Sequence, residues 1–166
     1  MAKILIHTTT LAEAKPLIDY FELTQSSQNT FINEKIVLIV SGLSKDLISN
    51  SLQNIFKSYE ITKAFDLSVA SCCDGSVKLG TLFCTNKFLK NINFAPITTL
   101  ENYDEDTEIE TIIADKQAKF FSDICKEKIE DYYVLKIVGD YFDEDITENK
   151  IFELIKNSIN KWKDLI

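Results

Sequence analysis

Several features that define other protein classes are missing from this sequence. No apolar run approaches the roughly 20 residues that a membrane-spanning helix needs, so we do not expect a membrane protein. Basic residues are outnumbered, because 18 lysines and arginines face 26 aspartates and glutamates and leave a net charge of −8. This net charge produces no electrostatic field that attracts phosphate backbones or anionic lipids. We therefore expect neither nucleic acid nor a membrane as a partner.

Glycine and cysteine are also scarce. Four glycines do not supply the glycine density of a Walker loop or a dinucleotide-binding loop. The four cysteines lack the paired spacing of zinc sites, so we expect neither a metal nor another cofactor. The first residues lack the apolar core of a signal peptide, and reduced thiols in a cytoplasmic protein fit this pattern best.

The residues that are present supply enough apolar material for one core. Apolar residues make up 45% of the 166 residues and aromatic residues 11%, at a length typical of one domain. Segments of strand and helix character follow one another along the chain. We therefore predict a single α/β domain over residues 1–166, with three layers in which helices cover a central mixed sheet.

Apolar periodicity places the regular elements. Apolar runs predict strands over 4–8, 30–32, 35–40, 95–100 and 132–138. A helical period predicts helices over about 11–21, 45–59, 110–129 and 147–162. Residues 24–30 are polar, and the acidic run at 104–110 is interpreted as a solvated linker.

Two helix starts carry recognisable caps. Thr10 followed three residues later by Glu13 matches a capping box, although Pro16 favours a start one or two residues further on. Ser44 is the expected N-cap of the second helix, where a helix N-terminus after a strand can hold an anion. The acidic residues at 143–145 suit the N-terminus of the last helix, which favours a structural role over metal binding.

The most informative stretch runs from Lys63 to Thr85. Two β-favouring segments flank the small residues Ala70–Cys73 and a polar reversal at 74–76, which predicts a strand, a small-residue loop and a second strand. Small side chains at the end of a buried strand leave room for a ligand to approach the backbone. A second candidate is Asp140, because it places a carboxylate at the end of another apolar strand.

Five short motifs, taken in order, resemble those of one enzyme superfamily. It is the superfamily of purine nucleoside phosphorylases and methylthioadenosine/adenosylhomocysteine nucleosidases, which also contains futalosine hydrolase. The motifs are Ala12–Leu17, Val40–Lys45 with its Ser-Gly turn, Ser68–Cys72 continuing through Asp74–Gly80, Ala114–Ala118 and Ile137–Asp140.

The resemblance implies cleavage of the N-glycosidic bond of a purine-type nucleoside, with water or phosphate accepting the sugar. Asp140 matches the residue that assists the base at N7, and Glu13 matches the glutamate that activates water. Gly42, Ala70, Ser71, Cys72, Lys116 and Gln117 fall at substrate-binding positions. No phosphate-binding arginine can be assigned, which favours hydrolysis over phosphorolysis and transfer. The family also implies a homo-oligomer, with a small-molecule nucleoside or nucleobase as its ligand.

The departures from the family pattern are equally specific. Gln117 stands where the family has a glutamate that binds the ribose hydroxyls, and Lys116 replaces a methionine that packs on the sugar. An amide still accepts a hydrogen bond but supplies no negative charge to a developing cation. Ser71 and Cys72 replace a glycine pair under the base, and the segment between about 100 and 112 is shorter than the family's.

These departures leave two functions open. The chain is either an active nucleosidase or a catalytically silent relative that binds a nucleoside or acts as an interaction subunit. Individual residues keep simpler alternatives: Glu13 as a helix cap, Asp140 as a turn carboxylate and His7 as a packed side chain. A redox role for the adjacent Cys72 and Cys73 ranks lowest, because nothing basic lies beside them in sequence.

Overall fold

The computed structural model describes residues 1–101, 108–143 and 145–166. Within these ranges the helices are α1 (Leu11–Tyr20), α2 (Lys45–Ser58), α3 (Ala118–Lys128) and α4 (Glu148–Trp162), followed by a short 3-10 turn at Lys163–Leu165. The strands are β1 (Lys3–Thr8), β2 (Thr24–Ser27), β3 (Thr30–Ile32), β4 (Ile36–Val40), β5 (Ile61–Cys72), β6 (Leu82–Cys84), β7 (Asn93–Phe94), β8 (Ile97–Thr99), β9 (Ile113–Asp115) and β10 (Tyr132–Asp140).

The strands of the described chain form one mixed sheet with the order β2-β3-β4-β1-β5-β10-β6-β7. Its centre is parallel, since β1 pairs in parallel with β4 and β5, and β5 pairs in parallel with β10. Antiparallel pairs occur in the β2–β3–β4 meander and between β10 and β6, while the edge strand β7 pairs in parallel with β6. Parallel strands carry their carboxyl ends to the same edge of the sheet, which is where α/β proteins bind ligands.

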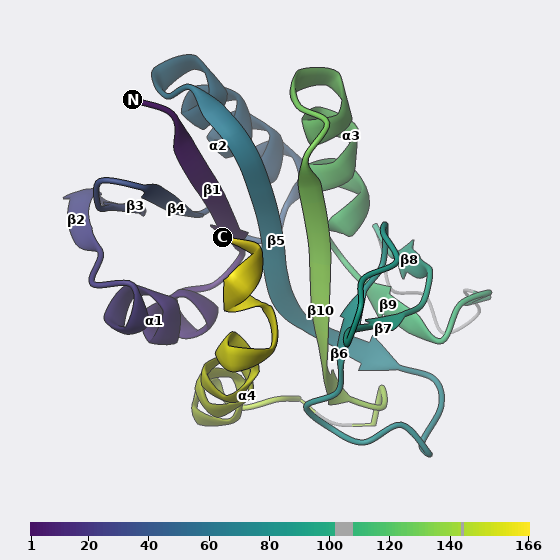
Figure 1. The fold of residues 1–166 in the computed structure, drawn as a ribbon. Helices are drawn as coiled ribbons and strands as arrows, with labels where there is room; N and C mark the ends of the chain where they lie inside the picture. The colour runs from purple at the N-terminus through teal and green to yellow at the C-terminus, as the bar shows by residue number, and fades with distance from the viewer. Residues whose placement is uncertain (102–107, 144) are drawn as a thin grey trace.

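Helices cover both faces of the sheet, as the three-layer prediction requires (Figure 1). On one face, α1 and α4 pack on a core that contains Leu17, Phe65 and Trp162. On the other, α2 and α3 pack on a core that contains Leu52 and Phe121. The strand β4, whose residues are all apolar, lies between β3 and β1 in the interior of the sheet.

Helix caps determine where three helices begin. Thr10 accepts a hydrogen bond from the Glu13 N–H at 3.3 Å, and the Glu13 carboxylate accepts one from the Thr10 N–H at 3.0 Å. This reciprocal box starts α1 at Leu11, so the later start that Pro16 favoured is wrong. Ser44 and Thr147 cap α2 and α4. The Ser44 cap was predicted and is confirmed, whereas for the last helix the sequence predicted only an approximate start near 147.

Two other boundaries differ from the predictions. The segment Ala70–Cys72 is not a loop: β5 continues through it, because Ser71 and Cys72 pair with Ala114 and Ile113 of β9. The same pairing makes 113–115 a strand, so α3 begins at Ala118 and not near 110. The expected acidic linker falls largely on 102–107, outside the described residues, as does Glu144.

Candidate functional site

A cavity of about 490 Å³ lies at the carboxyl ends of β5 and β10. Of the predicted site residues, Ser71, Lys116 and Asp140 line it. The rest of the lining comes from the segment after β10, namely Phe142, Asp143, Asp145 and Ile146. Side chains from three separate parts of the sequence therefore meet in one opening.

Asp140 owes its position to the end of β10. It pairs in register with Ser71 of β5, and its Oδ1 accepts a hydrogen bond from the Phe142 N–H at 2.9 Å. Phe142 has a φ of 66°, so the chain turns sharply directly after the strand. The Asp140 side chain is half-buried, and the turn fixes one oxygen while the residue still borders the cavity.

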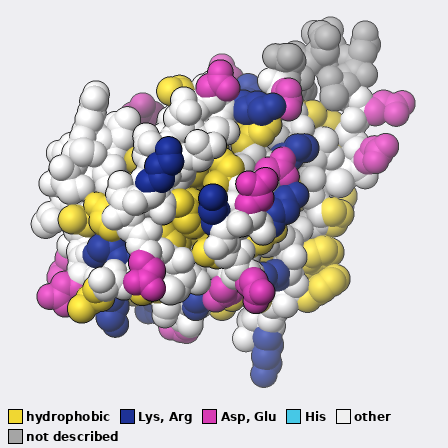
Figure 2. Space-filling model, turned by 90° about the horizontal axis from the view of Figure 1, so that it is seen from above, with side chains coloured by type: hydrophobic (Ala, Val, Ile, Leu, Met, Phe, Trp, Pro, Cys, Tyr) yellow, Lys and Arg dark blue, Asp and Glu magenta, His cyan; other side chains and the backbone are white. Residues whose placement is uncertain are grey.

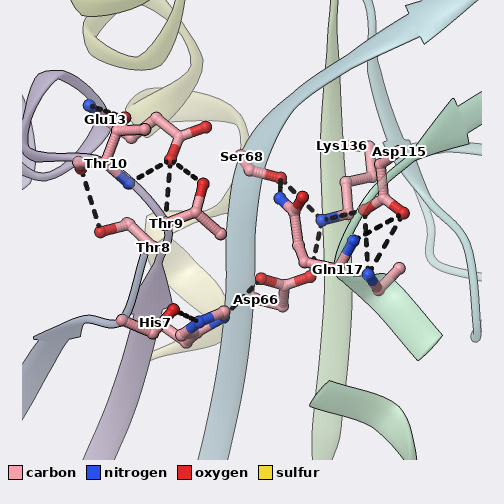
Figure 3. Close-up of polar contacts among 12 residues, drawn as sticks. His7, Thr8, Thr9, Thr10, Glu13, Asp66, Ser68, Asp115, Gln117 and Lys136 are labelled. Carbon is pink, nitrogen blue, oxygen red and sulfur yellow. Dashed lines mark hydrogen bonds and ion pairs between the residues drawn. The ribbon is translucent and has the colours of Figure 1, made fainter. Parts of the chain in front are cut away.

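Glu13 is buried at the start of α1, with 2% of its surface exposed. Its Oε2 accepts hydrogen bonds from the Thr9 N–H at 3.0 Å, the Thr9 hydroxyl at 2.9 Å and the Thr10 N–H at 3.0 Å. Figure 3 shows these contacts with Thr9 and Thr10. The Oε1 of Glu13 accepts a further hydrogen bond from the Val69 N–H of β5 at 3.2 Å. The helix-capping role is therefore present, and the carboxylate also connects α1 to the strand that ends in Ser71.

Gln117 is buried directly before α3, with 3% of its surface exposed. Its Nε2 donates a hydrogen bond to Ser68 Oγ at 2.5 Å, so the amide points toward β5. Neither Gln117 nor Glu13 lines the Asp140 cavity. The structure thus brings Asp140, Ser71 and Lys116 together and places the other two beneath the same edge of the sheet.

The remaining predicted contacts belong to the backbone around this edge. Ala70 and Cys72 are buried in β5, and Cys72 Sγ contacts the Asp74 carbonyl oxygen at 3.5 Å. Gly42 has a φ of 88°, in the region that favours glycine, and its N–H donates to the Thr9 carbonyl oxygen at 3.1 Å. A Cβ at Gly42 would lie 2.9 Å from Leu47 Cδ1. This glycine keeps the β4–α2 turn close to the end of β1.

A buried charged cluster lies under the site and was not expected from the sequence. Lys136 of β10 contacts Asp66 Oδ2 at 2.6 Å and Asp115 Oδ2 at 2.8 Å, and all three side chains are almost fully enclosed. His7 Nδ1 lies 2.8 Å from Asp66 Oδ1, and its Nε2 lies 2.7 Å from Ser41 Oγ. The sequence signal was a charged side chain between apolar neighbours in each strand: Asp66 between Phe65 and Leu67, and Lys136 between Leu135 and Ile137.

The cluster keeps Asp66 and Lys136 ionised, because its contacts shift the pKa of each residue away from the usual value. Burial would raise the pKa of Asp66, but the Lys136 ammonium and His7 outweigh burial and hold that pKa below its usual value. Burial would lower the pKa of Lys136, yet Asp115 and Asp66 raise it above its usual value. His7 also stacks on Phe121, with 5.5 Å between the ring centroids. The packed interpretation of this histidine agrees with its complete burial.

Comparison with known proteins adds the fold relationship. No protein-family model and no curated protein sequence matches this chain. Among solved structures, a variant of the nucleosidase MTAN from Chlamydia trachomatis matches with a TM-score of 0.80 and 13% identity, over 100% of both chains. The chain has the fold of a nucleosidase. The likeness that the motifs indicated is thereby confirmed for the architecture.

Two further structures support the nucleosidase fold. Campylobacter jejuni 5'-methylthioadenosine/S-adenosyl homocysteine nucleosidase has a TM-score of 0.77 at 12% identity, covering 98% of this chain and 97% of that one. Futalosine hydrolase of Helicobacter pylori has a TM-score of 0.78 at 12% identity, covering 99% of this chain and 97% of that one.

Further features of the described residues concern metal ligands, thiols, membrane spans and surface charge. Among the described residues, no group of three or more His, Cys, Asp or Glu side chains is placed to hold a metal ion. Burial raises the pKa of the Cys73 thiol, with a further contribution from Cys72, which opposes thiolate formation. No helix in the described ranges has the length and apolar character of a membrane span. On the face shown in Figure 2, lysine and acidic side chains are interspersed.

Proposed function

We propose that this chain binds a purine nucleoside or its base in the Asp140 cavity and hydrolyses the N-glycosidic bond. The observation that carries the proposal is the meeting of Asp140, Ser71 and Lys116 in one cavity at the carboxyl ends of β5 and β10. Two Chlamydia trachomatis MTAN structures with this fold hold adenine and MTA. A planar base against the end of β5 fits the same edge of the sheet here.

In the proposed reaction the two carboxylates act at opposite ends of the bond. Asp140 hydrogen-bonds or protonates the departing base. Glu13, which does not line the cavity but contacts Val69 two residues before Ser71, activates the water that attacks the sugar. Glu13 Oε1 accepts one described hydrogen bond, from Val69, and a carboxylate oxygen has capacity for a second. Water is the proposed nucleophile because the 18 basic residues are all lysines, leaving no arginine to bind phosphate.

Release of free base from a panel of purine nucleosides tests this function. Asp140→Asn should lower the rate by a factor of about 100 or more, because the amide cannot act as a general acid or base. Asp123→Asn is the matched control, since Asp123 lies on α3 and pairs with Lys119 and Lys126 outside the cavity. Absence of turnover on every nucleoside by the folded wild type would reject hydrolysis.

Binding without turnover is the second candidate function. It is favoured by the state of Gln117, whose neutral amide is committed to Ser68 and supplies no charge to a cationic transition state. A silent binding protein should gain thermal stability with adenine or a nucleoside while the glycosidic bond remains intact by chromatography. An interaction subunit without a ligand site should show neither stabilisation nor cleavage.

A further inference from the structure

Lys136 is completely buried, and its ammonium group is fully satisfied. Its Nζ lies 2.6 Å from Asp66 Oδ2, 2.6 Å from Ser68 Oγ and 2.8 Å from Asp115 Oδ2 (Figure 3). An ammonium group has three N–H donors, so each donor has one acceptor. A lysine held in this way is a fixed point within the sheet and differs from a solvated side chain.

The acceptors of Lys136 lie on the elements that lead into the cavity. Asp66 and Ser68 belong to β5, which ends in the segment that contains the cavity residue Ser71. Asp115 is the last residue of β9 and directly precedes Lys116. Lys136 itself lies on β10, the strand that ends in Asp140. One ammonium group therefore joins the three strands whose ends carry Ser71, Lys116 and Asp140.

Asp115 extends this connection into α3. Its carboxylate accepts hydrogen bonds from the Gln117 N–H at 3.3 Å, from the Ala118 N–H at 3.0 Å and from the Thr99 hydroxyl at 3.0 Å. The N-cap residue Gln117 makes no side-chain capping bond. The Asp115 carboxylate thus takes over the capping of α3, and the Lys136 ammonium holds that carboxylate.

Backbone pairing alone gives β9 only a short attachment. It pairs with β5 at two positions, Ser71 with Ala114 and Cys72 with Ile113, and with the three-residue strand β8. The ion pair between Lys136 and Asp115 adds a contact to a long central strand. The geometry points to Lys136 as a positioning residue that sets Lys116 and Gln117 relative to Asp140.

Hydrogen exchange of individual amides tests this role without any ligand. The double variant Lys136→Met, Asp115→Asn removes the ion pair but leaves no unpaired carboxylate at 115, and Asp66 keeps His7. The amides of Gln117 and Ala118 should exchange at least about tenfold faster than in the single variant Asp115→Asn, which already lacks the capping carboxylate, since their local opening becomes easier without Lys136. The amide of Ile151 in α4, which donates to the Thr147 carbonyl oxygen, should not change.

Lys63→Met is the matched control variant. Lys63 is a partly buried lysine of β5 whose Nζ lies 3.7 Å from Asp131, away from the cavity lining. Its loss should leave exchange at Gln117 and Ala118 unchanged. Equal acceleration at Gln117, Ala118 and Ile151 in the double variant would overturn the inference, because it would show a general loss of stability.

The effect on ligand affinity rests on the proposed function and forms a second arm. Calorimetric titration with adenine should give a dissociation constant about tenfold higher in the double variant and unchanged in Lys63→Met. Faster exchange with unaltered affinity would overturn the link to the cavity. If the wild type binds neither adenine nor any nucleoside, the proposed function fails, while the exchange measurement still decides whether Lys136 positions the start of α3.

Discussion

The Glu13 carboxylate makes two kinds of structural contact, one through each oxygen atom. Its Oε2 completes the capping box, and its Oε1 faces the Val69 N–H of β5. The capping box could be predicted from the spacing of Thr10 and Glu13, because it depends on local geometry. The contact with Val69 could not, since it joins residues 56 positions apart in the sequence.

Separate variants distinguish helix capping by Glu13 from its proposed activation of water. Thr10→Ala removes the cap hydroxyl and should lower the free energy of unfolding by about 1 kcal/mol without lowering turnover. Glu13→Gln should abolish turnover if Glu13 activates water, and should cost about 1–3 kcal/mol because an amide nitrogen must then face an N–H donor. Chemical denaturation and nucleoside hydrolysis measure the two effects. Full activity in Glu13→Gln would leave capping as its only role.

The buried cluster predicts a pH dependence of stability at both extremes. The folded pKa of Asp66 is lowered, so the unfolded chain binds a proton first below about pH 4 and stability falls as pH decreases. The folded pKa of Lys136 is raised, so the unfolded chain loses its proton first above about pH 10.4 and stability falls as pH increases.

Urea unfolding from acid to alkaline pH measures these two losses. The double variant Asp66→Asn, Lys136→Met should show smaller slopes at both ends, by up to about 1.4 kcal/mol per pH unit for each group removed. Equal slopes in both proteins across the whole range would contradict the assigned pKa directions.

At the scale of elements, predictions succeeded where the signal was local. The capping box of Thr10 and Glu13 and the cap at Ser44 are each encoded within a few residues, and the structure contains both. The polar edge strand β2 escaped prediction because all four of its side chains are exposed and its pairing with β3 supplies the order. The β5–β9 pairing was likewise invisible, because it joins segments about 40 residues apart.

Gly139 offers a test of how the end of β10 is held. A Cβ at this residue would lie 2.9 Å from Ile146 Cδ1 and 3.2 Å from Val69 Cβ. Gly139→Ala should therefore lower the free energy of unfolding by about 1–3 kcal/mol and weaken ligand binding by displacing Asp140. Gly75→Ala is the control, because nothing lies within 4 Å of its added Cβ. If Gly139→Ala unfolded at the same temperature as the wild type, the end of β10 would be able to shift and accommodate the added methyl group.

At the scale of the molecule, the sequence identified the edge of the sheet that carries the site but not its depth. The family resemblance named Ser71, Lys116 and Asp140 as site residues, while their common location at neighbouring strand ends came only from the structure. Which side chains face the cavity and which face the interior depends on packing, so the burial of Gln117 against Ser68 emerged only from the structure. Self-association, expected from the family resemblance, stays a prediction.

The negative charge of the chain should favour binding of an uncharged nucleoside over its negatively charged phosphate ester. The net charge is −8, and among the described residues the cavity lining contains Asp140, Asp143 and Asp145 against one cation, Lys116. AMP should therefore bind more weakly than adenosine, with a difference that shrinks as salt is raised from about 0.01 to 0.15 M and screening shortens from about 30 to 8 Å. Calorimetry at both salt concentrations measures this difference in affinity.

Lys116→Met should weaken the binding of AMP further, and the control Lys119→Met should not, because Lys119 is already paired with Asp123. Tighter binding of AMP than of adenosine at low salt would show that Lys116 outweighs the three carboxylates, and would make the nucleotide the better ligand.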